Sequence, residues 1–87
     1  MNDGQKIKEL IQIMVGPLVT KPQQLKISYQ PRTGEFEFVL ELATVDIGRV
    51  IGRQGRVISA LRILLNSLDF SNHQLIKLDI KGDKKLS

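Results

Sequence analysis

Three glycines interrupt the middle of the chain, and they constrain its fold more than any other feature of the sequence. Gly48, Gly52 and Gly55 punctuate a region with helical patterning, so one continuous helix cannot run through it. After Gly55 the apolar residues recur at helical spacing: Val57, Ile58, Leu61, Leu64, Leu65 and Leu68. The region therefore predicts a short helix starting near Val45 and capped by Thr44, a tight turn at the glycines, and a longer second helix.

The other elements follow from the same kind of periodicity. Three- and four-residue spacing predicts an N-terminal amphipathic helix with an apolar face of Ile7, Leu10, Ile11, Met14, Val15 and Leu18. Alternating apolar and polar residues predict strands over 25–30, 35–42 and 75–81. Pro31-Arg32-Thr33-Gly34 has the chemistry of a turn, so the first two strands form an antiparallel hairpin. Residues 69–74 form a polar connection.

The order of these elements predicts an α+β fold. Helix, strand, strand, helix, helix and strand follow one another, and a helical crossover makes the last strand parallel to the second. We expect a three-stranded mixed sheet with the helices packed on one face. A chain of 87 residues forms one domain, which we place at 1–81, followed by a short charged tail at 82–87 that we expect to be frayed.

The positive charge of the chain is local. The net charge is only +4, from 13 Lys and Arg against 9 Asp and Glu, which favours polyanionic partners weakly. Between Ile47 and Leu68, however, there is no acidic residue, and four arginines fall in that stretch: Arg49, Arg53, Arg56 and Arg62. The positive field therefore coincides with the glycines.

A sugar-phosphate backbone fits the chemistry of this segment. Gly52 and Gly55 allow another backbone to approach closely, and the first turn of the following helix offers N–H groups and the positive end of its dipole. Arg53 and Arg56 can add charge-assisted contacts to phosphate oxygens, while Gln54 can donate or accept without charge. The spacing does not fit the dinucleotide motif GxGxxG, and no GK[ST] follows as in a P-loop.

The run Val50-Ile51-Gly52-Arg53-Gln54-Gly55-Arg56-Val57-Ile58 resembles the KH (K-homology) family of nucleic-acid-binding domains. From about Ile7 to Ile80 the element order is similar to the type II arrangement of bacteria, and the short chain resembles the small single-KH proteins of the KhpA type. The resemblance implies a GXXG loop that clamps about four nucleotides of single-stranded RNA, with an apolar groove beside it. The loop contacts would come from Gly52, Arg53, Gln54, Gly55, Arg56 and Arg49. The groove would come from Ile47, Val50, Ile51 and Ile58, with part of the adjoining third strand.

The resemblance also implies partners and a role. It implies a homodimer, or a heterodimer with a larger KH protein of the KhpB type, and a bacterial post-transcriptional regulator or RNA chaperone linked to cell-wall growth or division. Single-stranded DNA stays an alternative ligand, because a backbone clamp contacts phosphates in both nucleic acids. Disabled family copies often carry acidic residues inside the loop, whereas this chain has Arg53 and Gln54, so we expect a competent loop. Because no aromatic residue lies near it, we expect weak binding with little sequence preference.

Several of these residues have a second interpretation. Val50 and Ile51 could self-associate between two protomers instead of lining a groove. Ile58 has the period of a core residue. Arg49 could shield a carboxylate such as Asp46.

The remaining polar residues do not assemble a reactive site. Arg62 is expected on a solvated helix face that points away from the loop, and His73 at the surface. Glu35, Glu37 and Glu41 share one strand face and are expected to face solvent or the basic helices. With no Cys and one His, a disulfide, a zinc site and a Cys- or His-based nucleophile are excluded. We therefore expect no enzyme, no metal and no cofactor.

The chain shows no sign of a membrane segment. No apolar run approaches the ~20 residues that span a bilayer. Residues 1–10 contain charged side chains and lack the apolar stretch of a signal peptide. We therefore expect a cytoplasmic location.

Overall fold

The computed structural model describes residues 3–68 and 75–81. The elements are α1 (Asp3–Val15), β1 (Lys26–Arg32), β2 (Glu35–Glu41), α2 (Thr44–Ile51), α3 (Arg56–Ser67) and β3 (Leu75–Ile80). Three 3₁₀ turns join them: η1 (Gly16–Leu18), η2 (Pro22–Gln24) and η3 (Arg53–Gly55). The predicted α+β order is confirmed. The predicted connection at 69–74, with His73, and the predicted tail at 82–87 lie outside the described residues.

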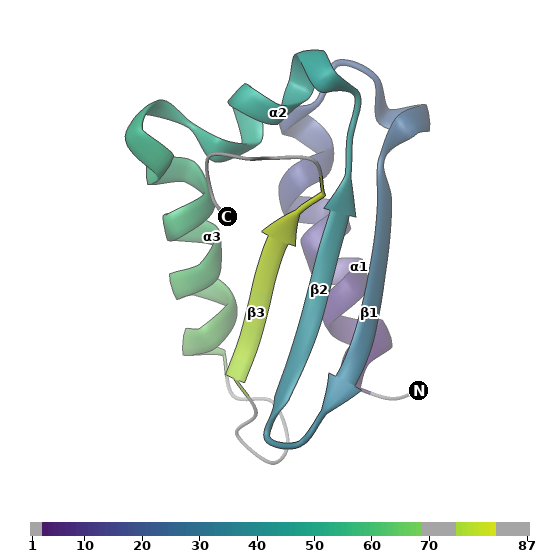
Figure 1. Cartoon of the computed structure of the whole chain (residues 1–87), viewed down its shortest axis with the longest axis vertical. Coiled ribbons are helices and arrows are strands. Elements are labelled where there is room, and N and C mark those ends of the chain that lie inside the picture. The colour runs from purple at the N-terminus through teal and green to yellow at the C-terminus, as the bar shows by residue number, and fades with distance from the viewer. Residues whose placement is uncertain (1–2, 69–74, 82–87) are drawn as a thin grey trace.

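The three strands form one mixed sheet in the order β1-β2-β3. β1 pairs antiparallel with β2, from Lys26 opposite Glu41 to Arg32 opposite Glu35, and β2 pairs parallel with β3. Figure 1 shows why the last pairing is parallel: α2 lies across the end of the sheet where β2 finishes, and α3 descends beside β3. The chain therefore returns to the opposite end before β3 begins.

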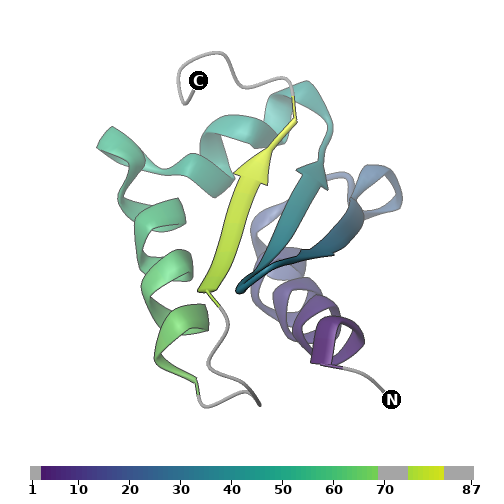
Figure 2. The same cartoon turned by 60° about the horizontal axis from the view of Figure 1, so that its bottom comes forward.

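α1 and α3 cover one face of the sheet and leave the other open (Figures 1 and 2). The core between them is apolar: Ile7, Ile11, Val15, Ile27, Phe38, Leu40, Val50, Ile58, Leu61, Leu65, Ile76, Leu78 and Ile80. Strand alternation puts the charged residues of the sheet on the open face. The predicted packing of the helices is confirmed, although Leu64 and Leu68 of the predicted apolar face are exposed.

Two local details differ from the predictions. β1 continues through Pro31 and Arg32, so only Thr33 and Gly34 connect the strands, and Pro31 is accommodated because β1 is an edge strand. The predicted cap at Thr44 is wrong: Thr44 is the first residue of α2, its N-cap residue is Ala43, and no side chain caps the helix.

The aromatic side chains of the described residues lie on β1 and β2. The rings of Tyr29 and Phe38 lie 5.2 Å apart, and the ring of Phe36 contacts both. Gly4 lets the start of α1 approach this cluster, since a Cβ there would clash with the Tyr29 ring. Within the described ranges, no helix has the length and apolar character needed to cross a bilayer.

Candidate nucleic-acid interface

Gly52 ends α2 in a conformation that only glycine adopts readily, with φ +77° and ψ 170°. Its N–H donates to the carbonyl oxygen of Gly48 at 2.9 Å, which closes the last turn of the helix. A Cβ on Gly52 would lie 2.7 Å from the backbone nitrogen of Val57 and nearer still to the Val57 side chain. The first turn of α3 therefore packs directly on the loop, a contact that the glycine spacing did not predict.

Gly55 and Gln54 also have positive φ, but no side chain packs against Gly55. Gly55, the N-cap residue of α3, has φ +76° and ψ 14°, but a Cβ on it would meet nothing within 4 Å. Gln54 has φ 57° and is the one non-glycine residue with positive φ in the described part of the chain. Such a residue costs on the order of 1–2 kcal/mol, and strain of this kind concentrates at functional sites. The backbone thus opens a space beside Gly55 and leaves Arg53 and Gln54 exposed.

The arginines around the loop are exposed and unneutralised. Arg49, Arg53 and Arg56 belong to none of the ion pairs found within 3–68 and 75–81. The Nη2 of Arg56 donates to Oε1 of Gln54 at 3.4 Å, a bond to a neutral acceptor. The three guanidinium groups therefore keep donors for an anionic ligand.

The predicted apolar groove is only partly available. The side chains of Val50 and Ile58 are 0% and 1% exposed and belong to the core, so the prediction that they line a groove is wrong. The alternative of Val50 at a protomer interface is wrong for the same reason. Ile47 and Ile51 are half-buried and keep some exposed surface. Helical periodicity explains the difference, because Asp46 and Val50 form the inner face of α2 and Ile47 and Ile51 flank it.

Asp46 anchors the start of α2, and the sequence did not reveal this. Its carboxylate is 0% exposed and accepts hydrogen bonds from the Thr20 N–H at 2.9 Å, the Thr20 hydroxyl at 2.8 Å and the Lys21 N–H at 3.0 Å. Burial alone would raise the pKa of Asp46, but these hydrogen bonds and the nearby charge of Arg49 hold that pKa below its usual value. Arg49 thus adds to the field at Asp46 without forming an ion pair with it. Because Thr20 and Lys21 lie 26 and 25 residues before Asp46, the local spacing of residues did not predict these contacts.

Most of the charged side chains on the open face of the sheet form ion pairs, unlike the arginines around the loop. Three of the carboxylates pair with basic side chains on the same face: Arg32 with Glu37 at 3.3 Å, Lys77 with Glu35 at 3.5 Å, and Lys81, just after β3, with Glu41 at 2.9 Å. The fourth, Asp79, pairs with Arg62 of α3 at 3.3 Å, so the expectation of a solvated Arg62 is wrong. The prediction of a solvent-facing strand surface is confirmed for the three glutamates, whose basic partners lie on the same face.

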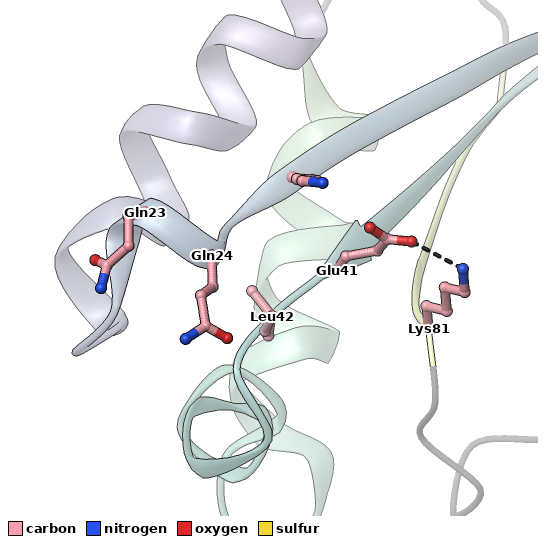
Figure 3. Close-up of a pocket in the computed structure, with 6 residues that line it drawn as sticks. Gln23, Gln24, Glu41, Leu42 and Lys81 are labelled. Carbon is pink, nitrogen blue, oxygen red and sulfur yellow. Dashed lines mark hydrogen bonds and ion pairs between the residues drawn. The ribbon is translucent and has the colours of Figure 1, made fainter.

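An open hollow lies at one end of this face. Figure 3 shows Gln23, Gln24 and Leu42 around it, with Lys81 and Glu41 joined at its rim. The hydrogen bond and charge of Lys81 hold the pKa of Glu41 below its usual range, so this carboxylate is ionised at neutral pH and cannot serve as a general acid. Nowhere in the described part of the chain do three His, Asp or Glu side chains gather to hold a metal ion.

Known proteins are similar to this sequence over most of its length. A family model described as KhpA/KhpB, KH domain, matches residues 8–84. The chain is 43% identical over 82 residues to RNA-binding protein KhpA of Lactiplantibacillus plantarum, covering 93% of this chain and 96% of that protein. It is 35% identical over 74 residues to the protein of that name from Listeria monocytogenes, covering 85% and 97% of the two chains. With RNA-binding protein KhpA of Chlamydia pneumoniae it shares 33% identity over 78 residues, which are 90% of this chain and all of the relative.

No solved structure matches the chain significantly. The family match covers both helices around the loop, the loop itself and the whole sheet. Its members are named for binding and not for a reaction, and the family is not one of enzymes, as the residue inventory predicted. The chain belongs to the KhpA/KhpB family of KH domains.

Proposed function

We propose that this chain binds single-stranded RNA by clamping about four nucleotides of its backbone at Gly52–Gly55. The observation that carries the proposal is the loop itself, in which three exposed arginines without carboxylate partners surround a backbone that is open beside Gly55. The relatives' name, RNA-binding protein, favours RNA over single-stranded DNA.

The clamp uses charge on one side and backbone on the other. A phosphate beside Gly55 meets no side chain and lies next to the N-terminal turn of α3, whose dipole favours negative charge. Arg53 and Arg56 supply guanidinium donors to the same or the adjacent phosphate, and Arg49 extends the positive surface. Ile47 and Ile51 offer the apolar surface on which a base can rest.

The family resemblance supports a wider role. The resemblance favours a cytoplasmic post-transcriptional regulator or RNA chaperone of a bacterium, linked to cell-wall growth or division. One domain at 1–81 that clamps about four nucleotides carries little specificity by itself. A second unit, from a dimer or a larger partner, would raise the effective concentration of a neighbouring site.

The test is fluorescence anisotropy of a labelled single-stranded RNA with the variant Arg53→Asp/Gln54→Asp. Both side chains are exposed, and Asp tolerates the left-handed backbone of position 54, so the fold is expected to survive. We expect the affinity to fall by roughly 100-fold or more, because two negative charges replace a phosphate contact and repel the backbone. Gly52→Asp would be a poorer choice, since its side chain would clash with Val57.

The matched control is Lys6→Asp/Gln12→Asp, which makes the same change in formal charge on α1. Both residues are exposed, and α1 lies on the opposite side of the molecule from α3 and the loop that precedes it (Figures 1 and 2). This variant should bind within about twofold of the natural chain. Equal losses in the two variants would mean that net charge, and not the loop, governs binding. A labelled DNA of the same sequence separates the two nucleic acids.

A second candidate function, self-association, is favoured by the outer surface of α3. Ile63 and Leu64 are 70% and 54% exposed, and Leu68, one turn after Leu64, is 44% exposed. We infer that a second copy of the chain covers this face in a homodimer, since burying three large apolar side chains is favourable. The resemblance to the KhpA type also favours a heterodimer with a larger KhpB-type protein, for which the same exposed apolar face is available.

Light scattering after gel filtration tests this candidate. The natural chain should have the mass of a dimer at high concentration, and Ile63→Glu/Leu64→Glu should have that of a monomer while keeping its helical circular dichroism. A natural chain that stays monomeric would exclude the homodimer.

A further inference from the structure

The two outer edges of the sheet are protected to different degrees. On the β3 side, side chains of α3 occupy outward backbone groups: Asn66 bonds to both the carbonyl oxygen and the N–H of Ile76, at 2.9 and 2.8 Å. Two nitrogens of Arg62 donate to the carbonyl oxygen of Leu78, at 2.9 and 2.7 Å. These side chains cap the β3 edge, which would otherwise present free backbone groups to another chain.

β1 is the other edge strand, and the pairing of the strands shows which of its backbone groups face outward. The Lys81 N–H donates to the Leu40 oxygen at 2.9 Å, so the backbone groups of Leu40 point toward β3. Ile27 lies directly opposite Leu40 in the antiparallel register of β1 and β2. Because opposite residues of an antiparallel pair either both face each other or both face away, the N–H and C=O of Ile27 point away from the sheet.

The outward groups of Ile27 are not capped in the way that the β3 edge is. Neither of them has a hydrogen-bond partner within 3–68 and 75–81. The open stretch is short, because the Leu25 N–H donates to the Pro22 oxygen at 3.1 Å on one side, and Pro31 on the other side has no N–H. β1 forms the outer margin of the sheet in Figure 1, so this stretch can be reached from outside.

A hollow lies beside the open stretch, between α1 and the start of β1. Its wall combines two aliphatic side chains, one amide and two cations: it is lined by Lys8, Gln12, Leu25, Lys26 and Ile27. No acidic residue lines the hollow, and neither lysine belongs to an ion pair within the described residues. Glu41, which lies opposite Lys26 in the sheet, is already bonded to Lys81 at 2.9 Å.

The charge of this edge decides which kind of chain it accepts. β1 carries two cations, Lys26 and Arg32, and no acidic residue, so pairing with β1 of a second copy would bring like charges together. An acidic segment of another protein meets the opposite situation, because the lysines of the hollow attract it. In an extended conformation that segment also supplies the backbone donor and acceptor that the outward groups of Ile27 lack.

We propose that the outer edge of β1 docks an extended acidic segment of a partner protein, which joins the sheet as a fourth strand beside Ile27. The partner residue opposite Ile27 exchanges hydrogen bonds with it and places its side chain over the hollow, against Leu25. The partner residues on either side point to the open face, where acidic side chains meet Lys26. β1 and β3 are opposite edges of the sheet, so this docking site is separate from α3 and the loop (Figures 1 and 2).

NMR titration of the isotope-labelled full chain with a peptide of alternating Glu and Val residues tests the proposal. The amide signal of Ile27 should shift with those of its neighbours in β1, and the signals of Gly52 and Gly55 should stay in place. Lys8→Glu/Lys26→Glu should weaken peptide binding by about tenfold or more, because the peptide then meets like charges. The matched control, Lys6→Glu/Lys77→Glu, makes the same change in charge at exposed positions outside the hollow and should bind within about twofold.

Backbone methylation of the peptide separates strand addition from simple charge attraction. With Val over the hollow, the Val N–H groups face β1 and the Glu N–H groups face away. Methylation of the Val nitrogens should therefore weaken binding by about tenfold or more, and methylation of the Glu nitrogens should change it by about threefold or less. Arg53→Asp/Gln54→Asp, the variant that tests RNA binding, should bind the peptide like the natural chain.

Three results would overturn the inference and leave the proposed function intact. The first is an absence of shifts in β1 at millimolar peptide, and the second is a set of shifts that lies around the loop instead. The third is equal binding of the two methylated peptides, which would show that charge and not strand pairing holds the segment. Loss of RNA binding in the loop variant bears on the proposed function alone.

Discussion

The loop side of the molecule and the open face of the sheet both carry basic residues, but only one of them leaves its charge unneutralised. On the open face four basic residues, Lys26, Arg32, Lys77 and Lys81, stand among four acidic ones, Glu35, Glu37, Glu41 and Asp79, and three ion pairs form within the sheet. Around the loop the arginines form none. A modest net charge thus becomes a local positive surface because its negative counterpart is gathered elsewhere.

The two regions also differ in how much of their backbone is already paired or covered. In the sheet the N–H and C=O groups of β2 are used by two neighbouring strands. In the loop, Gly52, Gln54 and Gly55 are left-handed, and the space beside Gly55 is open. A sugar-phosphate chain can therefore approach the backbone at the loop and not at the sheet. Pairing and backbone geometry, rather than the number of cations, therefore distinguish the proposed interface from the sheet.

The largest effect should come from the loop backbone. Gly52→Ala is expected to lower the free energy of unfolding by about 4 kcal/mol, because it combines a disfavoured φ with a clash against Val57. Gly55→Ala should cost only about 1 kcal/mol, since its Cβ enters open space. Urea unfolding of both variants measures the difference. Equal losses would show that the two glycines are not distinct in the way that the structure indicates.

The next effect compares two carboxylates, one behind the loop and one on the sheet. Asp46→Asn should lower the melting temperature by about 10 °C, because an amide cannot accept all three hydrogen bonds from Thr20 and Lys21. Glu41→Gln breaks only an exposed ion pair with Lys81 and should lower the melting temperature by about 3 °C or less. A larger effect of Glu41→Gln would reverse the comparison.

Low pH should remove the contribution of Asp46 to the stability of the fold. Its pKa is lowered in the folded chain, so its contribution is fully present above the unfolded pKa and is lost as the pH falls through the folded value. The difference in melting temperature between the natural chain and Asp46→Asn should therefore be constant near neutral pH and shrink below about pH 4. A difference that grows in acid would contradict the direction of this pKa shift.

The smallest effect concerns single cations on the two sides. Arg49→Gln should weaken RNA binding a few-fold and reduce the slope of log affinity against log salt by about 0.7, the loss of one phosphate contact. Lys26→Gln makes the same change on the open face, where Lys26 also lacks an ion pair within the described ranges. It should leave the slope unchanged. Equal slopes for the two variants would place Arg49 outside the interface.

Local patterns predicted the frame of this molecule, and long-range contacts account for what they missed. The glycine loop and the order of the elements were predictable because backbone freedom and periodicity depend on residues that are close together in the sequence. The burial of Val50 and Ile58 depends on how α2 and α3 pack on the sheet. The partners of Asp46 and Arg62 lie 16 or more residues away. Spacing alone cannot separate a groove residue from a core residue, or a solvated arginine from one that caps a strand.

RNA affinity at several salt concentrations, measured for two variants with the same loss of charge, separates the loop from the sheet. Arg53→Gln/Arg56→Gln removes two unpaired cations at the loop, and Lys77→Gln/Lys81→Gln removes two paired cations from the sheet. We expect the loop variant to lose roughly tenfold or more in affinity and about 1.4 from the slope of log affinity against log salt, while the sheet variant stays within about twofold of the natural chain. Equal losses in both variants, or a larger loss in the sheet variant, would contradict the proposed clamp at the loop.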